Sequence, residues 1–109
     1  MKRSDIFIKN GKPSIRFDIE NHMETLFKRH EKDGFTLCGY DWCSIIICFI
    51  DINPVTKEIW REFDYIPSNE NIVIIANDKQ SLNTFIKEFD KVCNDERYIE
   101  QLMSLIDYS

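Results

Sequence analysis

Residues 39–52 read Gly39-Tyr40-Asp41-Trp42 followed by CSIIICFIDI, and this stretch decides how the rest of the chain must fold. The run that begins at Cys43 is the most hydrophobic part of the sequence, so it must be buried and the other segments must cover it. Gly39 lets the chain turn, Asp41 can accept backbone N–H groups at a helix start, and Trp42 is a large apolar anchor. We therefore interpret Gly39, Tyr40, Asp41 and Trp42 as a structural motif.

The apolar run 43–52 fits two kinds of secondary structure. Its β-branched isoleucines favour a buried strand, and periodicity cannot decide because the run is apolar on all sides. Asp41 as an N-cap and Asn53-Pro54 as a stop signal favour a helix of about three turns. We predict the helix.

Composition indicates one globular domain over residues 1–109, with 43% hydrophobic and 30% charged residues. The longest apolar run is far shorter than the roughly 18 residues that a membrane span needs. The N-terminal residues include no apolar segment of signal-peptide length, so we expect a cytoplasmic protein without a membrane partner. In that compartment the four cysteines are expected to be reduced.

The N-terminal third predicts a β-hairpin and a short helix. Residues 5–9 and 14–19 are β-like runs, and Asn10-Gly11-Lys12-Pro13 between them is a turn signal. Asn21 with Glu24 three residues later approximates a capping box for the helix that follows. Asp33-Gly34 is expected to end that helix.

The second half predicts two strands and two amphipathic helices. Residues 58–66 are interpreted as a strand, 67–71 as a loop, and 72–76 as a short strand at the centre of a covered sheet. Asp78 is expected to cap the first helix, and Asn94-Asp95 is expected to break the chain and cap the second. The predicted fold is α+β: a small antiparallel sheet of about four strands covered by about four helices, in the order ββααββαα.

Charge is distributed unevenly along the chain. Residues 1–40 carry 8 basic and 6 acidic side chains, a net charge of +2, whereas residues 41–109 carry 6 basic and 13 acidic side chains, a net charge of −7. The second part would repel nucleic acid and attract a basic protein.

No pattern in the sequence indicates a cofactor, a metal site or a catalytic apparatus. Cys38, Cys43 and Cys48 are spaced by five, which would not bring their thiols together on a helix. The phosphate-binding loop, nucleophile-elbow and zinc-protease motifs are missing from the sequence. Glu62 and Asp64 could form a hydrolytic pair, but a solvated surface is the simpler interpretation of two such carboxylates.

The acidic residues of the second half have two interpretations, a solvated surface or a docking face for a basic partner. Tyr40, Trp60 and Tyr65 would supply the aromatic anchors that interfaces use. The acidic set comprises Asp41, Asp51, Glu58, Glu62, Asp64 and Glu70.

Residues 39–93 carry a resemblance to a known family. Gly-Tyr-Asp-Trp, an apolar helix, Phe63-Asp64, an apolar strand that runs into Ala76-Asn77-Asp78, and an amphipathic helix follow one another in order. This arrangement resembles immunity protein family fifty-one of bacterial polymorphic toxin systems, which include contact-dependent growth inhibition.

The resemblance implies a non-enzymatic antitoxin. Such a protein would bind the C-terminal toxin domain one to one as a monomer and block its active site, and the acidic half suits a basic nuclease toxin. The alternative is a non-catalytic adaptor domain that binds another protein, and a carboxylate-based enzyme is less favoured. The expected toxin contacts are Glu58, Glu62, Asp64, Tyr65 and Glu70.

Overall fold

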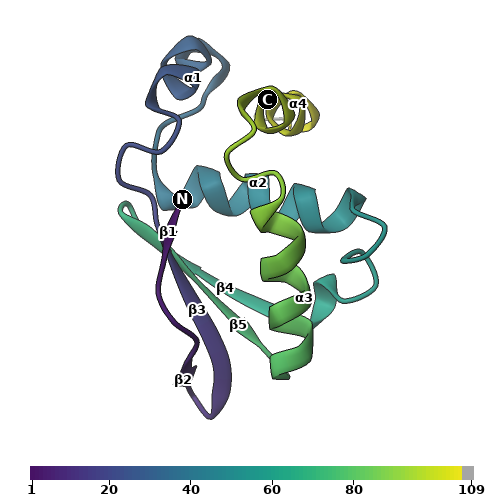
Figure 1. Cartoon of the computed structure of the whole chain (residues 1–109). Helices are drawn as coiled ribbons and strands as arrows, with labels where there is room; N and C mark the ends of the chain where they lie inside the picture. The colour runs from purple at the N-terminus through teal and green to yellow at the C-terminus, as the bar shows by residue number, and fades with distance from the viewer. Residues whose placement is uncertain (107–109) are drawn as a thin grey trace.

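A five-stranded antiparallel sheet with four α-helices forms the protein in the computed structural model, which describes residues 1–106 apart from the side chain of Trp60 (Figure 1). The predicted α+β class is confirmed, with one strand more than the four expected. The elements are β1 (Lys2–Arg3), β2 (Phe7–Lys9), β3 (Lys12–Asp18), α1 (Glu24–Arg29), η1 (Glu31–Asp33), α2 (Gly39–Ile52), η2 (Trp60–Glu62), β4 (Phe63–Pro67), β5 (Asn71–Ala76), α3 (Lys79–Asp90) and α4 (Glu96–Leu105).

The strands are arranged in the order β1-β3-β5-β4, and β2 shares the β1 side of β3. The β2–β3 hairpin turns at Asn10 and Gly11, whose φ values of 54° and 77° match the two left-handed positions of a type I′ turn. The turn signal in the sequence is thus confirmed. The fifth strand, β1, forms because Arg3 pairs with Phe17 at the far end of β3.

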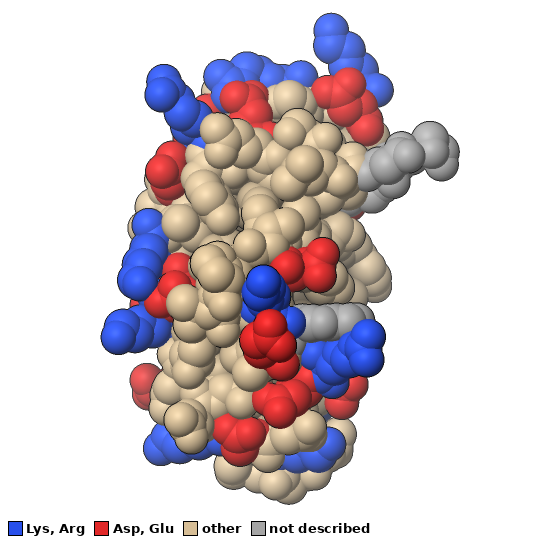
Figure 2. All heavy atoms as spheres, turned by 90° about the vertical axis from the view of Figure 1, so that its right-hand side faces the viewer, with Lys and Arg blue, Asp and Glu red and all other residues tan. Residues whose placement is uncertain are grey.

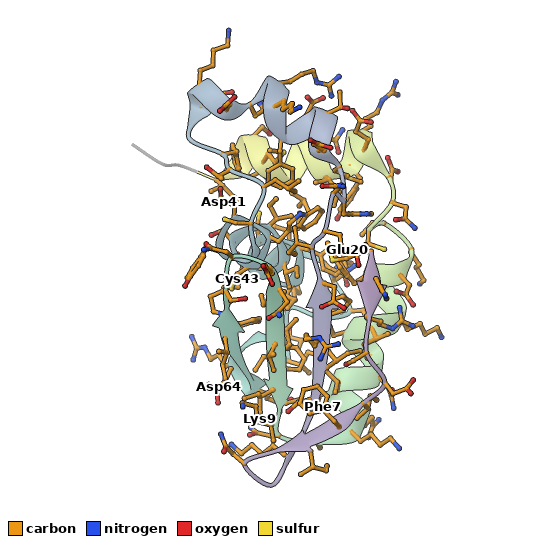
Figure 3. The ribbon with its side chains drawn as sticks, turned by 90° about the vertical axis from the view of Figure 1, so that its left-hand side faces the viewer. Phe7, Lys9, Glu20, Asp41, Cys43 and Asp64 are labelled. Atoms are coloured by element: carbon orange, nitrogen blue, oxygen red, sulfur yellow. The ribbon has the colours of Figure 1, made fainter. Side chains whose placement is uncertain are left out.

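Helices α2 and α3 lie against one face of the sheet, and α1 and α4 lie beyond α2 (Figure 1). Alternation along β3 points Ile15 and Phe17 toward the helices, where each is 1% exposed. The opposite face of the sheet, which Figure 3 views, carries side chains and no helix within the described residues. Pairing sets Ser14, Ile75 and Asp64 in one row across that face.

The core is aromatic and centres on α2, which settles residues 43–52 as a helix. Trp42 is fully buried, and its ring centroid lies 5.5 Å from that of Phe27 and 5.4 Å from that of His22. Phe49 contacts Phe89 across the α2–α3 boundary, with 5.4 Å between ring centroids. The prediction that Trp42 anchors the core is confirmed.

Two predicted helix caps are wrong. Helix α1 begins after Met23, which adopts a left-handed conformation, so Asn21 contributes its backbone carbonyl to the turn and makes no side-chain cap. Helix α2 begins at Gly39 rather than after Asp41, because the Gly39 N–H donates to the carbonyl of Asn69 (3.2 Å) and starts the helix earlier. The Asp41 carboxylate lies in the first turn and accepts a hydrogen bond from the Thr36 N–H (2.6 Å).

The strand predicted over 58–66 is also wrong in its first part. The chain makes tight turns in which the Glu62 N–H donates to the carbonyl of Ile59 (2.9 Å), and β4 begins only at Phe63. Local turn hydrogen bonds therefore replace the expected strand pairing. By contrast, Asp78 and Asp95 cap α3 and α4 as predicted, each accepting from the backbone N–H three residues on.

Candidate binding surface

The five predicted contact residues do not form one patch. Asp64 is exposed on the open face of the sheet, where Figure 3 labels it. Tyr65, the next residue, points to the opposite face and packs against the core. Burial raises the pKa of its phenol well above the usual range, with smaller contributions from Cys43 and Asp64. The phenol is therefore held neutral within the fold.

Glu58 and Glu62 lie on the approach to β4 rather than within a hairpin. Glu58 is exposed in the segment that follows α2. The Glu62 carboxylate accepts a hydrogen bond from the Ser81 hydroxyl (2.8 Å), which also lies 3.2 Å from the Asp78 carboxylate at the start of α3. The hydrogen bond between Ser81 and Glu62 thus helps to hold η2 against α3. The side chain of Trp60 lies outside the described residues.

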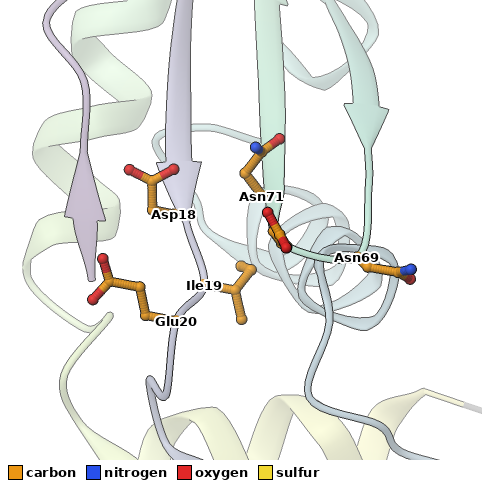
Figure 4. Close-up of a pocket in the computed structure, with 6 residues that line it drawn as sticks. Asp18, Ile19, Glu20, Asn69 and Asn71 are labelled. Carbon is orange, nitrogen blue, oxygen red and sulfur yellow. The ribbon is translucent and has the colours of Figure 1, made fainter.

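Glu70 lines a hollow of about 390 Å³ at one end of the sheet (Figure 4). The Arg16 guanidinium lies 3.1 Å from the Asp18 carboxylate, and the Lys2 ammonium lies 3.9 Å from that of Glu20. Glu70 makes no ion pair within the described residues. The hollow therefore presents acceptor oxygens, and the Glu70 carboxylate remains available to pair with a cationic side chain of a partner. Its lining comprises Asp18, Ile19, Glu20, Asn69, Glu70 and Asn71.

Backbone hydrogen bonds hold the hollow in shape. The Ile19 N–H donates to the carbonyl of Glu70 (2.9 Å), which fastens the end of β3 to the β4–β5 turn. Within that turn the Ser68 N–H donates to the carbonyl of Asn71 (2.8 Å). The carboxylates are thus carried on fixed backbone, which reduces the ordering cost when a partner binds.

A second hollow, of about 500 Å³, lies between the outer side of α2 and the end of α4. Asp51 is the charged residue that the described part of the chain contributes to its lining, and Ile47 and Leu105 are 41% and 62% exposed. We call it the α2 groove and define it by Ser44, Ile47, Cys48, Asp51, Leu105 and Ile106.

Sequence patterns alone do not reveal either hollow. Asp18 and Glu20 lie beside Glu70 only because Asp18 of β3 pairs with Asn71 of β5, and this pairing has no local signal. The outer face of α2 does carry a signal, since Tyr40 and Ile47 are seven residues apart and share a helix face. Because the run 43–52 is apolar on all sides, that spacing does not stand out in the sequence.

The described residues give little support to a metal site, a reactive thiol or a membrane-spanning helix. Within residues 1–106 no group of three or more His, Cys, Asp and Glu side chains could hold a metal ion. The thiols of Cys38, Cys43, Cys48 and Cys93 are free, and burial raises the pKa of Cys43 to about 11, which leaves that thiol unreactive. None of the described helices has the length and apolar character to cross a bilayer.

Figure 2 shows a further face on which acidic and basic side chains are interspersed, several of them as neighbouring red and blue groups near the middle of the view. Ion pairs such as Lys91 with Glu88 (2.7 Å) neutralise acidic residues locally. The acidic excess of residues 41–109 therefore does not gather on that face. The hollow beside Glu70 is the more one-sided acidic feature.

The fold and the two hollows define a small binding domain. The chain matches the family model described as Immunity protein 51 (Imm51) over residues 8–107. It therefore belongs to the Imm51 family, immunity proteins of polymorphic toxin systems that bind a cognate toxin and are generally non-catalytic. The resemblance carried by residues 39–93 is thus confirmed. No curated protein and no solved structure matches the chain.

Proposed function

We propose that this protein neutralises a basic nuclease toxin by binding its catalytic domain and occluding the active site, without catalysis of its own. One observation carries the choice of a basic target: among the described residues the hollow beside Glu70 is lined by three carboxylates, and that of Glu70 makes no ion pair. A nuclease needs a basic cleft because its substrate is a polyanion, and carboxylates can occupy that cleft in place of phosphates.

The acidic residues in and around the hollow would also speed association with a basic partner. Glu70, Glu20 and Asp64 are exposed and can steer a basic partner toward the end of the sheet. Glu58 remains a proposed contact because it too is exposed. We assign Glu62 and Tyr65, the other two predicted contacts, a supporting role because both are engaged within the fold.

The test compares two charge reversals of equal size. Glu20→Lys with Glu70→Lys alters the hollow, and Asp5→Lys with Glu31→Lys alters exposed residues elsewhere. Each double variant changes the net charge by +4, so a general charge effect would affect both equally. The partner is the toxin domain encoded by the adjacent gene.

We expect the hollow variant to associate at least about tenfold more slowly than the parent, and the control variant to stay within about threefold. The difference should shrink as salt rises, because screening shortens the range of steering to about 8 Å at physiological ionic strength. Cells that produce the toxin domain should lose protection with the hollow variant alone. Equal behaviour of the two variants would contradict binding through the acidic hollow.

A further inference from the structure

The strongly exposed large hydrophobic side chains of the described residues are concentrated in few elements, and two of them, Ile47 and Leu105, line the α2 groove together. There are seven, and five of them belong to α2, the segment after it or the end of α4: Tyr40, Ile47, Ile52, Val55 and Leu105. Single exposed apolar side chains are ordinary, but a contiguous set marks an interaction site. The other two, Ile8 and Ile66, lie apart on the hairpin and on β4.

Helix α2 lies between the sheet and helices α1 and α4, and a strip along its outer side stays exposed among the described residues (Figure 1). Its inner side carries buried residues such as Trp42 and Ile46. Tyr40, Ile47 and Asp51 fall at helical spacing on the outer side, and the span from residue 40 to 51 is about 16 Å at 1.5 Å per residue. That length matches what one short segment of a partner can cover.

The α2 groove also defines the chemistry of its occupant. Asp51 is the only charged residue in the lining and makes no ion pair within the described residues. Its carboxylate acts with burial to raise the pKa of the neighbouring Cys48 thiol, which stays neutral. An apolar segment that carries a lysine or arginine would fill the groove and satisfy this carboxylate.

The acidic hollow lies at the start of α2, and the groove lies further along the same helix. The Gly39 N–H donates to the carbonyl of Asn69, which lines that hollow, and Tyr40 opens the outer face of α2 one residue later. A single bound domain can therefore cover the hollow and the groove together. Carboxylates at one end would steer the partner, and apolar contacts along α2 would hold it.

We propose that the α2 groove is the second half of the toxin interface and receives an apolar segment of the cognate toxin domain whose lysine or arginine pairs with Asp51. This inference rests on the proposed function, because it names the surface through which the same partner is held. It commits to the toxin domain rather than to a second copy of this chain.

The experiment measures affinity for the toxin domain of the adjacent gene and oligomeric state in the same samples. Ile47→Glu places a carboxylate in the groove, and a basic partner would tolerate its charge, so any loss reports lost apolar packing. Asp51→Lys reverses the charge, and Leu105→Glu tests the α4 side. Ile8→Glu is the matched control, since Ile8 is 69% exposed and Leu105 is 62% exposed, and Ile8 lies on β2 outside both proposed surfaces.

We expect Ile47→Glu, Leu105→Glu and Asp51→Lys each to raise the dissociation constant at least about tenfold, chiefly through faster dissociation for the two apolar sites. Ile8→Glu should stay within about threefold of the parent, and the four variants should melt close to the parent. If Ile47→Glu lowers the melting temperature, the affinity of the Leu105→Glu variant, altered at the exposed end of α4, decides the test.

Parent-like affinity in the groove variants, while the parent binds the toxin domain, would overturn the groove assignment and leave the proposed function standing. A parent that fails to bind the toxin domain would instead remove the proposed function itself. Self-association of the parent that Ile47→Glu abolishes without weakening toxin binding would assign the groove to a second copy and overturn the inference.

Discussion

Gly39 and Asn71 lie in such close backbone contact that no side chain fits between helix α2 and the β4–β5 turn. A Cβ at position 39 would overlap the carbonyl oxygens of Ser68 and Asn71, and it would lie 2.9 Å from the carbonyl carbon of Asn71. The most buried helix of the protein therefore begins directly on the turn that holds Glu70. The stability of the core and the shape of the acidic hollow are coupled at this point.

Gly39→Ala should destabilise the protein by about 2–3 kcal/mol, because the added methyl group must push backbone rather than a flexible side chain. Urea unfolding would measure the loss. Ser44→Ala, five residues along the same helix on its outer side, is the control and should change stability by no more than about 0.5 kcal/mol. Equal stability of the two variants would show that the turn can move away from α2 at little cost.

Trp42→Ala should cost about 3–5 kcal/mol, because it opens a cavity beside Phe27 and His22. The indole N–H has no hydrogen-bond partner among the described residues, so Trp42→Phe removes volume without breaking a hydrogen bond and should cost clearly less. Tyr40→Ala, at a position 54% exposed, is the control. A Trp42→Ala variant that melts within a degree or two of the parent would contradict the central packing role.

Local signals in the sequence predict this fold well. The Asn10-Gly11 turn, the spacing from Leu82 to Phe89 and the cap at Asp78 each depend on residues within one or two turns of each other. All three are observed. The α+β class follows from such elements without knowledge of how they pack.

Prediction from the sequence fails where tertiary contacts decide the local structure. Asp41 looks like an N-cap, but the helix starts three residues earlier, at Gly39, whose N–H donates to the carbonyl of Asn69. Residues 58–62 look like a strand, but Glu62 turns to meet Ser81 on α3. In both places the deciding partner is at least 19 residues away, beyond the reach of periodicity or propensity.

In the candidate site too, local sequence signals predict some residues, and tertiary pairing determines the others. Charge and loop position alone indicate Glu70, whereas Asp18 and Glu20 join it only through the pairing of β3 with β5. Strand alternation separates Asp64 from Tyr65, and this separation can be predicted from the sequence, so the two neighbours do not belong in one contact set.

Asp78→Ala should cost about 1 kcal/mol, because the carboxylate accepts the Ser81 N–H at 2.7 Å and satisfies the start of α3. Asp78→Ser keeps an acceptor at the cap and should recover most of the loss. Asp5→Ala, at an exposed residue outside any helix, serves as the control for the loss of charge. Thermal unfolding of the four proteins would compare them, and an unchanged Asp78→Ala variant would contradict the capping role.

His30 should stabilise the protein more at acidic than at alkaline pH. Its ring lies 2.7 Å from the Glu100 carboxylate and 3.0 Å from that of Asp33, and hydrogen bonds to these two groups raise the pKa of His30 above its ordinary value of 6.5. The stabilisation is therefore fully present below about pH 6.5 and is lost as the pH rises through the raised pKa of the folded state. The hydrogen bond with His30 lowers the pKa of Glu100, and Arg29, at 3.5 Å from that carboxylate, lowers it further.

The free energy of unfolding of the parent should exceed that of His30→Gln by a margin that grows as the pH falls from about 8.5 to about 5.5.

His22 should have the opposite effect on the pH dependence of stability. Burial against Trp42 lowers the pKa of His22, although its hydrogen bond to the carbonyl of Cys93 (2.7 Å) acts in the other direction. Below about pH 6.5, His22 binds a proton more readily in the unfolded chain than in the folded protein, and this difference lowers the free energy of unfolding. His22→Gln should remove that loss. Urea unfolding at three pH values would measure both margins, and a pH-independent margin for His30→Gln would contradict the ion pairs with Glu100 and Asp33.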